Sequence, residues 1–158
     1  SITLQNKRNY PRSPHSRTLK KIEDSYIIPT KQRRILARLI FEKGHRHVSA
    51  ENLFDEVKKD DRKISMATIY NTLKQFTSLG LIREIVVDQN KSLYCNNNKS
   101  HYHLYIEDEG KIHDIPTKNI NLDIPSIPAC LSLHNIDVIV RVRSLKEDQE
   151  QNYLLCTT

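Results

Sequence analysis

The chain has 158 residues, enough for one ordinary domain or two small ones. Its 25 Lys and Arg against 19 Asp and Glu give a formal net charge of +6, which suits a polyanionic partner but also serves solubility. No run approaches the length of about 20 apolar residues that spans a bilayer, and the first residues do not form a signal-peptide pattern. We therefore expect a cytoplasmic protein that makes no membrane contact.

The three cysteines exclude two kinds of stabilised small domain. Cys95, Cys130 and Cys156 are odd in number, widely spaced and without a CxxC pair. Neither a disulfide scaffold nor a four-cysteine zinc site fits this pattern, so a metal site would have to use some of the seven histidines.

A basic arm opens the sequence. Six Lys and Arg residues precede the first acidic residue, Glu23, and prolines interrupt any helical pattern. A solvated terminus is the simpler interpretation of Lys7 to Arg17, and a contact to a phosphate backbone is the alternative.

Two helices are predicted after residue 29. In the first, Thr30 is a suitable N-cap and Gly44 can end the helix; the second follows the N-cap candidate Ser49 and carries Glu51 where it favours the helix dipole. Their apolar stripes are Ile35, Leu36, Leu39 and Ile40 in the first and Leu53, Phe54 and Val57 in the second.

A third helix is predicted from Ser65, another N-cap candidate, to Gly80. Ile69, Leu73 and Phe76 recur at spacings of four and three and face a core. The opposite face carries hydrogen-bonding groups with little negative charge, as a helix in a DNA major groove requires, although a merely solvated face gives the same pattern. The residues of that face are Thr68, Tyr70, Asn71, Lys74 and Gln75.

A hairpin follows the third helix. The β-prone runs 81–87 and 92–95 flank four turn-forming residues. Three helices followed by a hairpin predict a winged helix. The hairpin would bring Arg83 and Lys91 near a phosphate backbone, although exposed basic residues on hairpins are usually only solubilising.

The chain becomes strand-rich beyond about residue 95. Strands are predicted at 103–107 and 111–115 and within 136–142, and the segment 116–133, with three prolines, is an irregular crossover. Strands this short have exposed edges and too small a core, so we expect pairing with a second copy. The expected fold is α+β: a winged-helix domain followed by a small α/β dimerisation domain.

His101 and His103 are the sharpest local feature. Residues i and i+2 of a strand face the same side, so the two imidazoles can converge on one ion. Such a pair is a weak signal alone. It gains force from Cys95 just upstream and from His45 and His47 before the second helix.

Five segments stand in an order and spacing found in one protein family. They are TKQR at 30–33, HVSAE at 47–51, ATIYNTL at 67–73, LGL at 79–81 and HYH at 101–103. In these segments the chain resembles the ferric uptake regulator family, over residues of about 25–115 and again at 136–143. The resemblance implies a bacterial homodimer, mainly a repressor of transcription, that binds double-stranded operator DNA and responds to iron status.

The recognition helix of that family carries an Ala-Thr-hydrophobic-Tyr-Arg core whose tyrosine contacts bases. The chain matches at Ala67, Thr68 and Tyr70 and departs at Asn71. With residues 72–77 and 136–143, that asparagine resembles the iron response regulator branch known from alphaproteobacteria. The expected DNA-binding residues are Thr68, Tyr70, Asn71, Lys74, Arg83 and Lys91.

The family also has a hinge metal site made of a histidine, an acidic residue and an HxH pair. By resemblance these positions fall on His47, Cys95, His101 and His103. Cys95 would exchange a hard oxygen for a soft thiolate, which favours zinc or haem-type iron over manganese; a buried apolar cysteine is the alternative. The expected cofactor is a divalent metal (Fe²⁺, Mn²⁺ or Zn²⁺) or haem, which would set the angle between the two domains.

Haem is implied by the branch rather than by the residues. In the iron response regulators the protein acts when iron is scarce, and haem impairs DNA binding or stability. His101 and His103 are the candidate axial ligands, with Cys95 as a further donor, and no Cys-Pro haem motif occurs near the N-terminus. The family's structural four-cysteine zinc is not expected, because its first pair of positions falls on Ile106 and Glu109.

We expect the chain to divide into four segments: a basic flexible arm at 1–20, a winged-helix DNA-binding domain at 21–95, a dimerisation and metal- or haem-sensing domain at 96–143, and a tail at 144–158.

We expect no enzymatic activity. A small zinc metallohydrolase would need a general base beside the metal, whereas the nearby acids 107–109 lie at a predicted turn. A winged-helix module without a sensory role is the other alternative.

Overall fold

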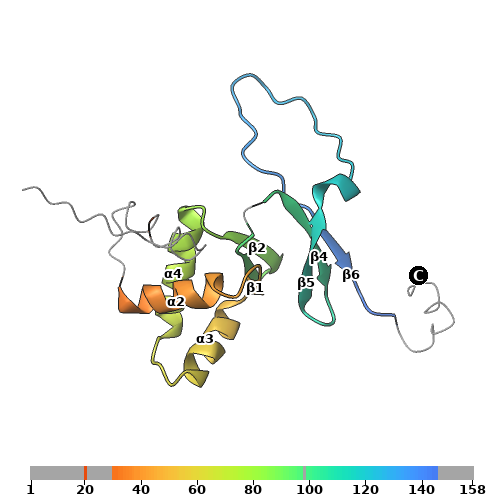
Figure 1. Ribbon diagram of the computed structural model, residues 1–158. Helices are drawn as coiled ribbons and strands as arrows, with labels where there is room; N and C mark the ends of the chain where they lie inside the picture. Colours follow the sequence, from red (N-terminus) through yellow and green to blue (C-terminus); the bar gives the residue numbers. More distant parts are fainter. Residues whose placement is uncertain (1–19, 21–29, 98, 146–158) are drawn as a thin grey trace, which may run out of the picture. The chain divides into compact units, whose positions relative to one another are not determined.

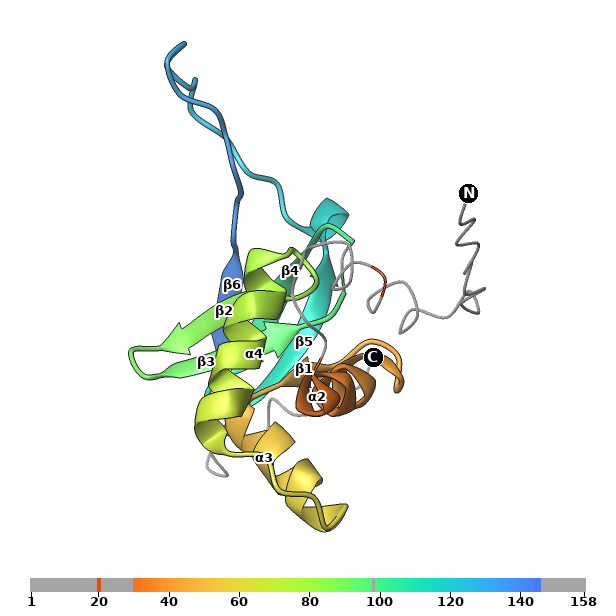
Figure 2. The same ribbon diagram turned by 90° about the vertical axis from the view of Figure 1, so that its left-hand side faces the viewer.

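A computed structural model describes residues 20, 30–97 and 99–145 (Figures 1 and 2). The basic residues from Lys7 to Arg17, for which a phosphate contact was considered, and the tail from residue 146 lie outside the described residues. The chain divides into two compact units, Ser1–Asn98 and Lys99–Thr158.

Three helices form the body of the first unit (Figure 1): α2 (Lys31–Phe41), α3 (Ala50–Lys59) and α4 (Met66–Ser78). Each begins at the predicted N-cap, because the side chains of Thr30, Ser49 and Ser65 accept a hydrogen bond from a backbone N–H of the first turn. Ser49 and Asn52 form a reciprocal capping box at the start of α3. None of the described helices is long and apolar enough to cross a membrane.

The predicted apolar faces of these helices meet in one core. Leu36 of α2, Leu53 of α3 and Leu73 of α4 are completely buried, and the rings of Phe41 and Phe76 lie 6.3 Å apart. The core continues into the residues that follow α4 and into the hairpin through Leu81, Ile82 and Tyr94. Burial of this apolar surface fixes how the three helices pack.

A small antiparallel sheet completes the first unit. Its strands are β1 (His47–Val48), β2 (Arg83–Asp88) and β3 (Lys91–Cys95), in the order β1-β3-β2. The predicted hairpin is therefore confirmed as β2 and β3, and its turn projects from the unit as a wing (Figure 2). Strand β1 was not predicted. Three helices and this sheet make the winged helix.

The second unit is a three-stranded sheet. Strand β4 (His101–Ile106) lies between β5 (Lys111–Pro116), which pairs with it antiparallel, and β6 (Ile139–Val142), which pairs with it parallel. A 3-10 turn, η1 (Thr117–Asn119), follows β5 and is the only helical element in residues 99–145. The rest of the connection to β6 is irregular, as predicted, and forms a long loop beyond the sheet (Figure 1).

The described part of the second unit, residues 99–145, has little apolar core of its own. Within residues 99–145 only His101, His103 and Tyr105 are buried, all on one face of β4. Large apolar side chains of the connection are exposed to solvent: Leu122, Ile124, Ile127, Leu131 and Leu133. The predicted α+β fold is thus confirmed, and in the part of the chain that the structure describes the extensive apolar core lies in the winged helix.

Candidate metal centre and nucleic-acid interface

Two histidines of β4 lie side by side in the second unit. His101 and His103 project from the same face of the strand, as predicted, and are 6% and 4% exposed. Their Nε2 atoms are 2.9 Å apart. Two imidazole nitrogens this close and this well buried form a preorganised pair of donors.

A backbone contact orients the first of these rings. The Nδ1 atom of His101 lies 2.5 Å from the carbonyl oxygen of Lys99. Because a carbonyl oxygen only accepts hydrogen bonds, Nδ1 is the donor of this contact, and Nε2 is the ring nitrogen that faces His103. Metal-binding histidines are oriented by the same kind of contact.

A carboxylate from β5 completes this group. Residues His103 and Asp114 are direct partners in the antiparallel ladder, so their side chains share a face. The Oδ1 atom of Asp114 lies 3.3 Å from Nε2 of His101 and 3.6 Å from Nε2 of His103. Sequence reasoning missed Asp114, because only the register of β4 and β5 identifies it as the partner of His103. We call His101, His103 and Asp114 the histidine cluster.

The first unit holds a second pair of donors. His47 of β1 and Cys95 of β3 are direct partners in the β1–β3 ladder, and their ligand atoms lie within 4.8 Å of each other. Cys95 is 1% exposed, and its Sγ atom accepts a hydrogen bond from the backbone N–H of Asn97 at 3.4 Å. We call His47 and Cys95 the β1–β3 pair.

The donor chemistry of both groups fits a transition-metal ion. Two imidazoles and a carboxylate, or an imidazole and a thiolate, are ligand types that Zn²⁺ and Fe²⁺ accept. Haem fits less well, because His101 and His103 are buried against each other and a wide macrocycle could reach either Nε2 only after the pair separated. His113 and His134 are exposed, and neither belongs to the histidine cluster or to the β1–β3 pair.

The outer face of α4 has the predicted character. Tyr70 is 47% exposed, Asn71 and Lys74 are exposed, and Thr68 is half-buried. The helix contains no Asp or Glu. Gln75 differs from expectation, because its Oε1 atom is buried without a hydrogen-bond partner among the described residues.

The two basic residues of the hairpin differ in exposure. Lys91 is exposed beside the hairpin turn, where it lies opposite Asp88 in the β2–β3 ladder. Arg83 is half-buried and lies opposite Cys95 in the β2–β3 ladder. Lys91 is therefore the more accessible of the two for a phosphate.

A carboxylate stands beside Tyr70. The Tyr70 hydroxyl donates a hydrogen bond to Oε1 of Glu51, in the first turn of α3, at 2.9 Å. This bond raises the pKa of Tyr70. A hydrogen bond within the Glu51 residue lowers the pKa of its carboxyl, and the bond from Tyr70 and the charge of Lys91 act in the same direction. Sequence reasoning assigned Glu51 only to the helix dipole.

Known proteins share both sequence and fold with this chain. A peroxide-responsive repressor PerR of Staphylococcus aureus (strain USA300) is 33% identical over 92 residues, covering 58% of this chain and 62% of that protein. The match thus spans less than two thirds of the repressor's length.

Solved structures have the same fold. The Vibrio cholerae ferric uptake regulator aligns with a TM-score of 0.61 and 23% identity, over 79% of this chain and 98% of that one. The ferric uptake regulator of Francisella tularensis with iron aligns with a TM-score of 0.60 and 21% identity, over 75% and 93%. The profile of the Ferric uptake regulator family matches residues 27–140. Because that match covers most of the sequence, the chain belongs to the ferric uptake regulator family.

Proposed function

We propose that the chain is a sequence-specific DNA-binding regulator of transcription, mainly a repressor, whose DNA affinity is set by a metal ion. The observation that carries this proposal is the histidine cluster, in which two buried imidazoles and a more exposed carboxylate converge on one face of a sheet. Membership of the ferric uptake regulator family and the exposed, acid-free face of α4 support the DNA-binding half of the proposal.

The proposal joins the histidine cluster and the β1–β3 pair around one ion. The two groups belong to different units of the chain, so a shared ion would restrict the angle between the winged helix and the second unit. That angle sets the spacing of two recognition helices in a dimer. Such coupling typically changes DNA affinity by about 1 to 3 kcal/mol. Rearrangement of DNA-binding domains is named for the Vibrio cholerae relative.

For the ion we propose Fe²⁺ or Zn²⁺ ahead of Mn²⁺. The Francisella tularensis relative is named with iron, and a thiolate at Cys95 favours the softer ions. The narrower assignment to the iron response regulator branch, with haem as the signal, is also proposed. It rests on Asn71 and the sequence around it, and the burial of His101 and His103 weighs against haem as a direct ligand.

We further propose that the chain acts as a homodimer on double-stranded DNA in the cytoplasm. The exposed apolar side chains between η1 and β6 would be covered by a second copy, since residues 99–145 bury few apolar side chains themselves. The proposed DNA contacts are Thr68, Tyr70, Asn71, Lys74, Arg83 and Lys91, with Lys91 and Arg83 serving phosphates.

The test is equilibrium binding of the full chain to a palindromic AT-rich operator under anaerobic conditions. Separate titrations with Fe²⁺, Mn²⁺, Zn²⁺ and haem identify the signal. A divalent ion that tightens binding in the wild type but not in His101→Ala supports the metal-activated form. Weaker binding in haem alone supports the iron response regulator branch.

Two results would favour the alternatives. If DNA affinity is the same with and without Fe²⁺, Mn²⁺, Zn²⁺ or haem, and is unchanged in His101→Ala and His103→Ala, the chain is a winged-helix module without a sensory role. Zinc-dependent ester or amide hydrolysis that is lost in Asp114→Asn would indicate a metallohydrolase. Family membership favours neither alternative.

A further inference from the structure

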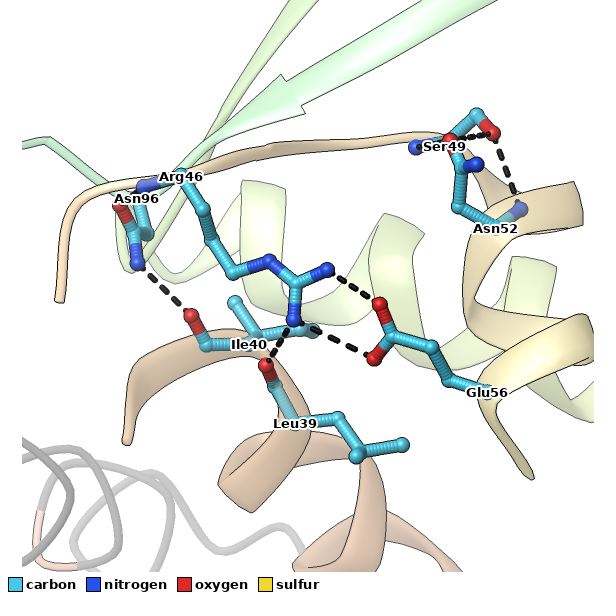
Figure 3. A network of polar contacts seen from close by, with 7 residues as sticks. All are labelled: Leu39, Ile40, Arg46, Ser49, Asn52, Glu56 and Asn96. Atoms are coloured by element: carbon cyan, nitrogen blue, oxygen red, sulfur yellow. Dashed lines mark hydrogen bonds and ion pairs between the residues drawn. The ribbon is translucent and has the colours of Figure 1, made fainter. Parts of the chain in front are cut away.

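Arg46, Glu56 and Asn96 form a polar network within the winged helix (Figure 3). This network is next in sequence to the β1–β3 pair. Arg46 precedes His47, and Asn96 follows Cys95. The backbone N–H of Arg46 donates to Oδ1 of Asn96 at 2.8 Å, and the backbone N–H of Asn96 donates to the Arg46 carbonyl at 3.3 Å. Arg46 and Asn96, the neighbours of His47 and Cys95 in the sequence, are therefore hydrogen-bonded to each other.

Asn96 also attaches this ladder to the end of α2. Its Nδ2 donates to the carbonyl oxygens of Ile40 and Gly44, each at 2.7 Å. The carbonyl of Ile40 lies in the last turn of α2, where carbonyl groups lack partners within the helix. Gly44 has a φ of +78°, which permits the turn that brings the chain back toward Asn96. One amide side chain thus satisfies the helix end and positions β3.

Arg46 attaches the same ladder to α3. Its guanidinium donates to the Leu39 carbonyl at 2.7 Å and to both carboxylate oxygens of Glu56, with Oε2 at 3.2 Å. The side chains of Arg46 and Glu56 are only 19% and 23% exposed. A two-pronged bond of this kind fixes orientation as well as distance, because both groups are planar.

Strand β1 consists of His47 and Val48 alone. Two residues supply too few ladder bonds to hold a register without help, so the contacts of Arg46 and Asn96 set the position of His47 against Cys95. We propose that Arg46, Asn96 and Glu56 are positioning residues for the β1–β3 pair, and that they couple the metal ion to the packing of α2 and α3. This inference rests on the proposed metal function.

The expected loss of metal affinity can be taken from groups that orient metal ligands in other proteins. Replacing groups that orient metal ligands typically lowers metal affinity about 10-fold to 100-fold. Removing either the contacts of Asn96 or those between Arg46 and Glu56 should lower metal affinity by this factor. The winged helix should still fold, because its apolar core is unchanged. By linkage, an ion that requires the network must also stabilise it by the same factor.

The test is Co²⁺ titration of the full chain, because a thiolate bound to Co²⁺ gives a charge-transfer absorption. The variants are Asn96→Ala, Glu56→Gln and Arg46→Lys; the last keeps the positive charge but removes the two-pronged bond to Glu56. The matched control is Glu42→Gln, which breaks the exposed ion pair of Arg38 and Glu42 on α2 without touching the network. Circular dichroism and the melting temperature without metal report the fold separately.

We expect Asn96→Ala and Glu56→Gln to keep their helix content, to bind Co²⁺ about 10-fold to 100-fold more weakly and to lose thiolate absorption. Arg46→Lys should weaken Co²⁺ binding by a similar factor, because an ammonium group cannot make the two-pronged bond to Glu56. Glu42→Gln should match the wild type. If Asn96→Ala does not fold, Glu56→Gln decides, because it preserves shape. Folded variants with Co²⁺ affinity within about twofold of the wild type would overturn this inference but leave the proposed metal centre standing. If Cys95→Ser and His101→Ala bind Co²⁺ as tightly as the wild type does, the proposed metal centre is wrong, and the inference fails with it.

Discussion

The Tyr70 hydroxyl donates a hydrogen bond to Glu51 at 2.9 Å, joining the exposed face of α4 to the first turn of α3. This contact fixes the direction of the phenol ring before any DNA arrives. It also puts a negative charge beside the surface proposed to meet phosphates. Tyr70 and Glu51 together should therefore favour a correct base sequence over general attraction to DNA.

The first prediction concerns this specificity. Glu51→Gln removes the charge and weakens the bond to Tyr70, so binding to non-specific DNA should tighten while operator binding does not. The ratio of operator affinity to non-specific affinity should fall. Fluorescence anisotropy at matched salt measures both affinities. An unchanged ratio would show that Glu51 does not take part in discrimination.

The second prediction concerns acid stability. The folded-state pKa of Glu51 is lowered, so its contribution to stability is present above its ordinary value of 4.5 and is lost as the pH falls through the lower folded value. When the pH falls from about 6 to about 3, the melting temperature of Glu51→Gln should therefore decrease less than that of the wild type. An equal decrease of the melting temperature in the two proteins would contradict this assignment.

The third prediction separates base contacts from phosphate contacts. Tyr70→Ala should weaken operator binding by about 1 to 3 kcal/mol and non-specific binding much less. Stability should change little, because the side chain is 47% exposed. Lys91→Ala is the comparison, since the loss of a proposed phosphate contact weakens both kinds of binding alike. Equal losses for Tyr70→Ala on both DNAs would remove Tyr70 from base recognition.

The fourth prediction concerns Asp114. Asp114→Asn keeps the shape of the side chain but removes the charge that faces Nε2 of His101 and His103. Metal affinity should fall at least about tenfold, measured by titration with Zn²⁺. His113→Asn is the matched control, because His113 precedes Asp114 on the same strand and is exposed. Similar Zn²⁺ affinities in the two variants would exclude Asp114 as a ligand.

The fifth prediction concerns the core of the winged helix. Phe76 is 1% exposed and packs beside Phe41, so Phe76→Ala should lower the free energy of unfolding by about 3 to 5 kcal/mol. Val86→Ala should cost less than about 0.5 kcal/mol, because Val86 is 57% exposed. Urea denaturation measures both. Comparable losses would mean that Phe76 is not central to the core.

Local signals made the helices and the hairpin predictable. Thr30, Ser49 and Ser65 are caps that act within one turn, and the apolar spacing of Ile69, Leu73 and Phe76 is visible in a short window. The HxH pair needed only the alternation of a strand. These features depend on neighbours a few residues away, so the sequence contains them directly.

Contacts between distant segments were not predictable in the same way. Strand β1 has two residues and exists because β3 pairs with it. Asp114 joins the histidines through the register of β5, and one step of slip would turn it to the other face. Glu51 meets Tyr70 only through the packing of α3 on α4. Each of these depends on tertiary structure that no local pattern encodes.

The parallel pairing of β4 with β6 has a consequence for synthesis of the chain. All segments of the winged helix precede residue 98, whereas β6 begins at Ile139. A growing chain therefore has its helical core before β4 gains its second neighbour. Until Val142 leaves the ribosome, β4 keeps an open edge that other strands can join. The strand that carries both histidines is thus open to pairing with other strands until β6 has formed.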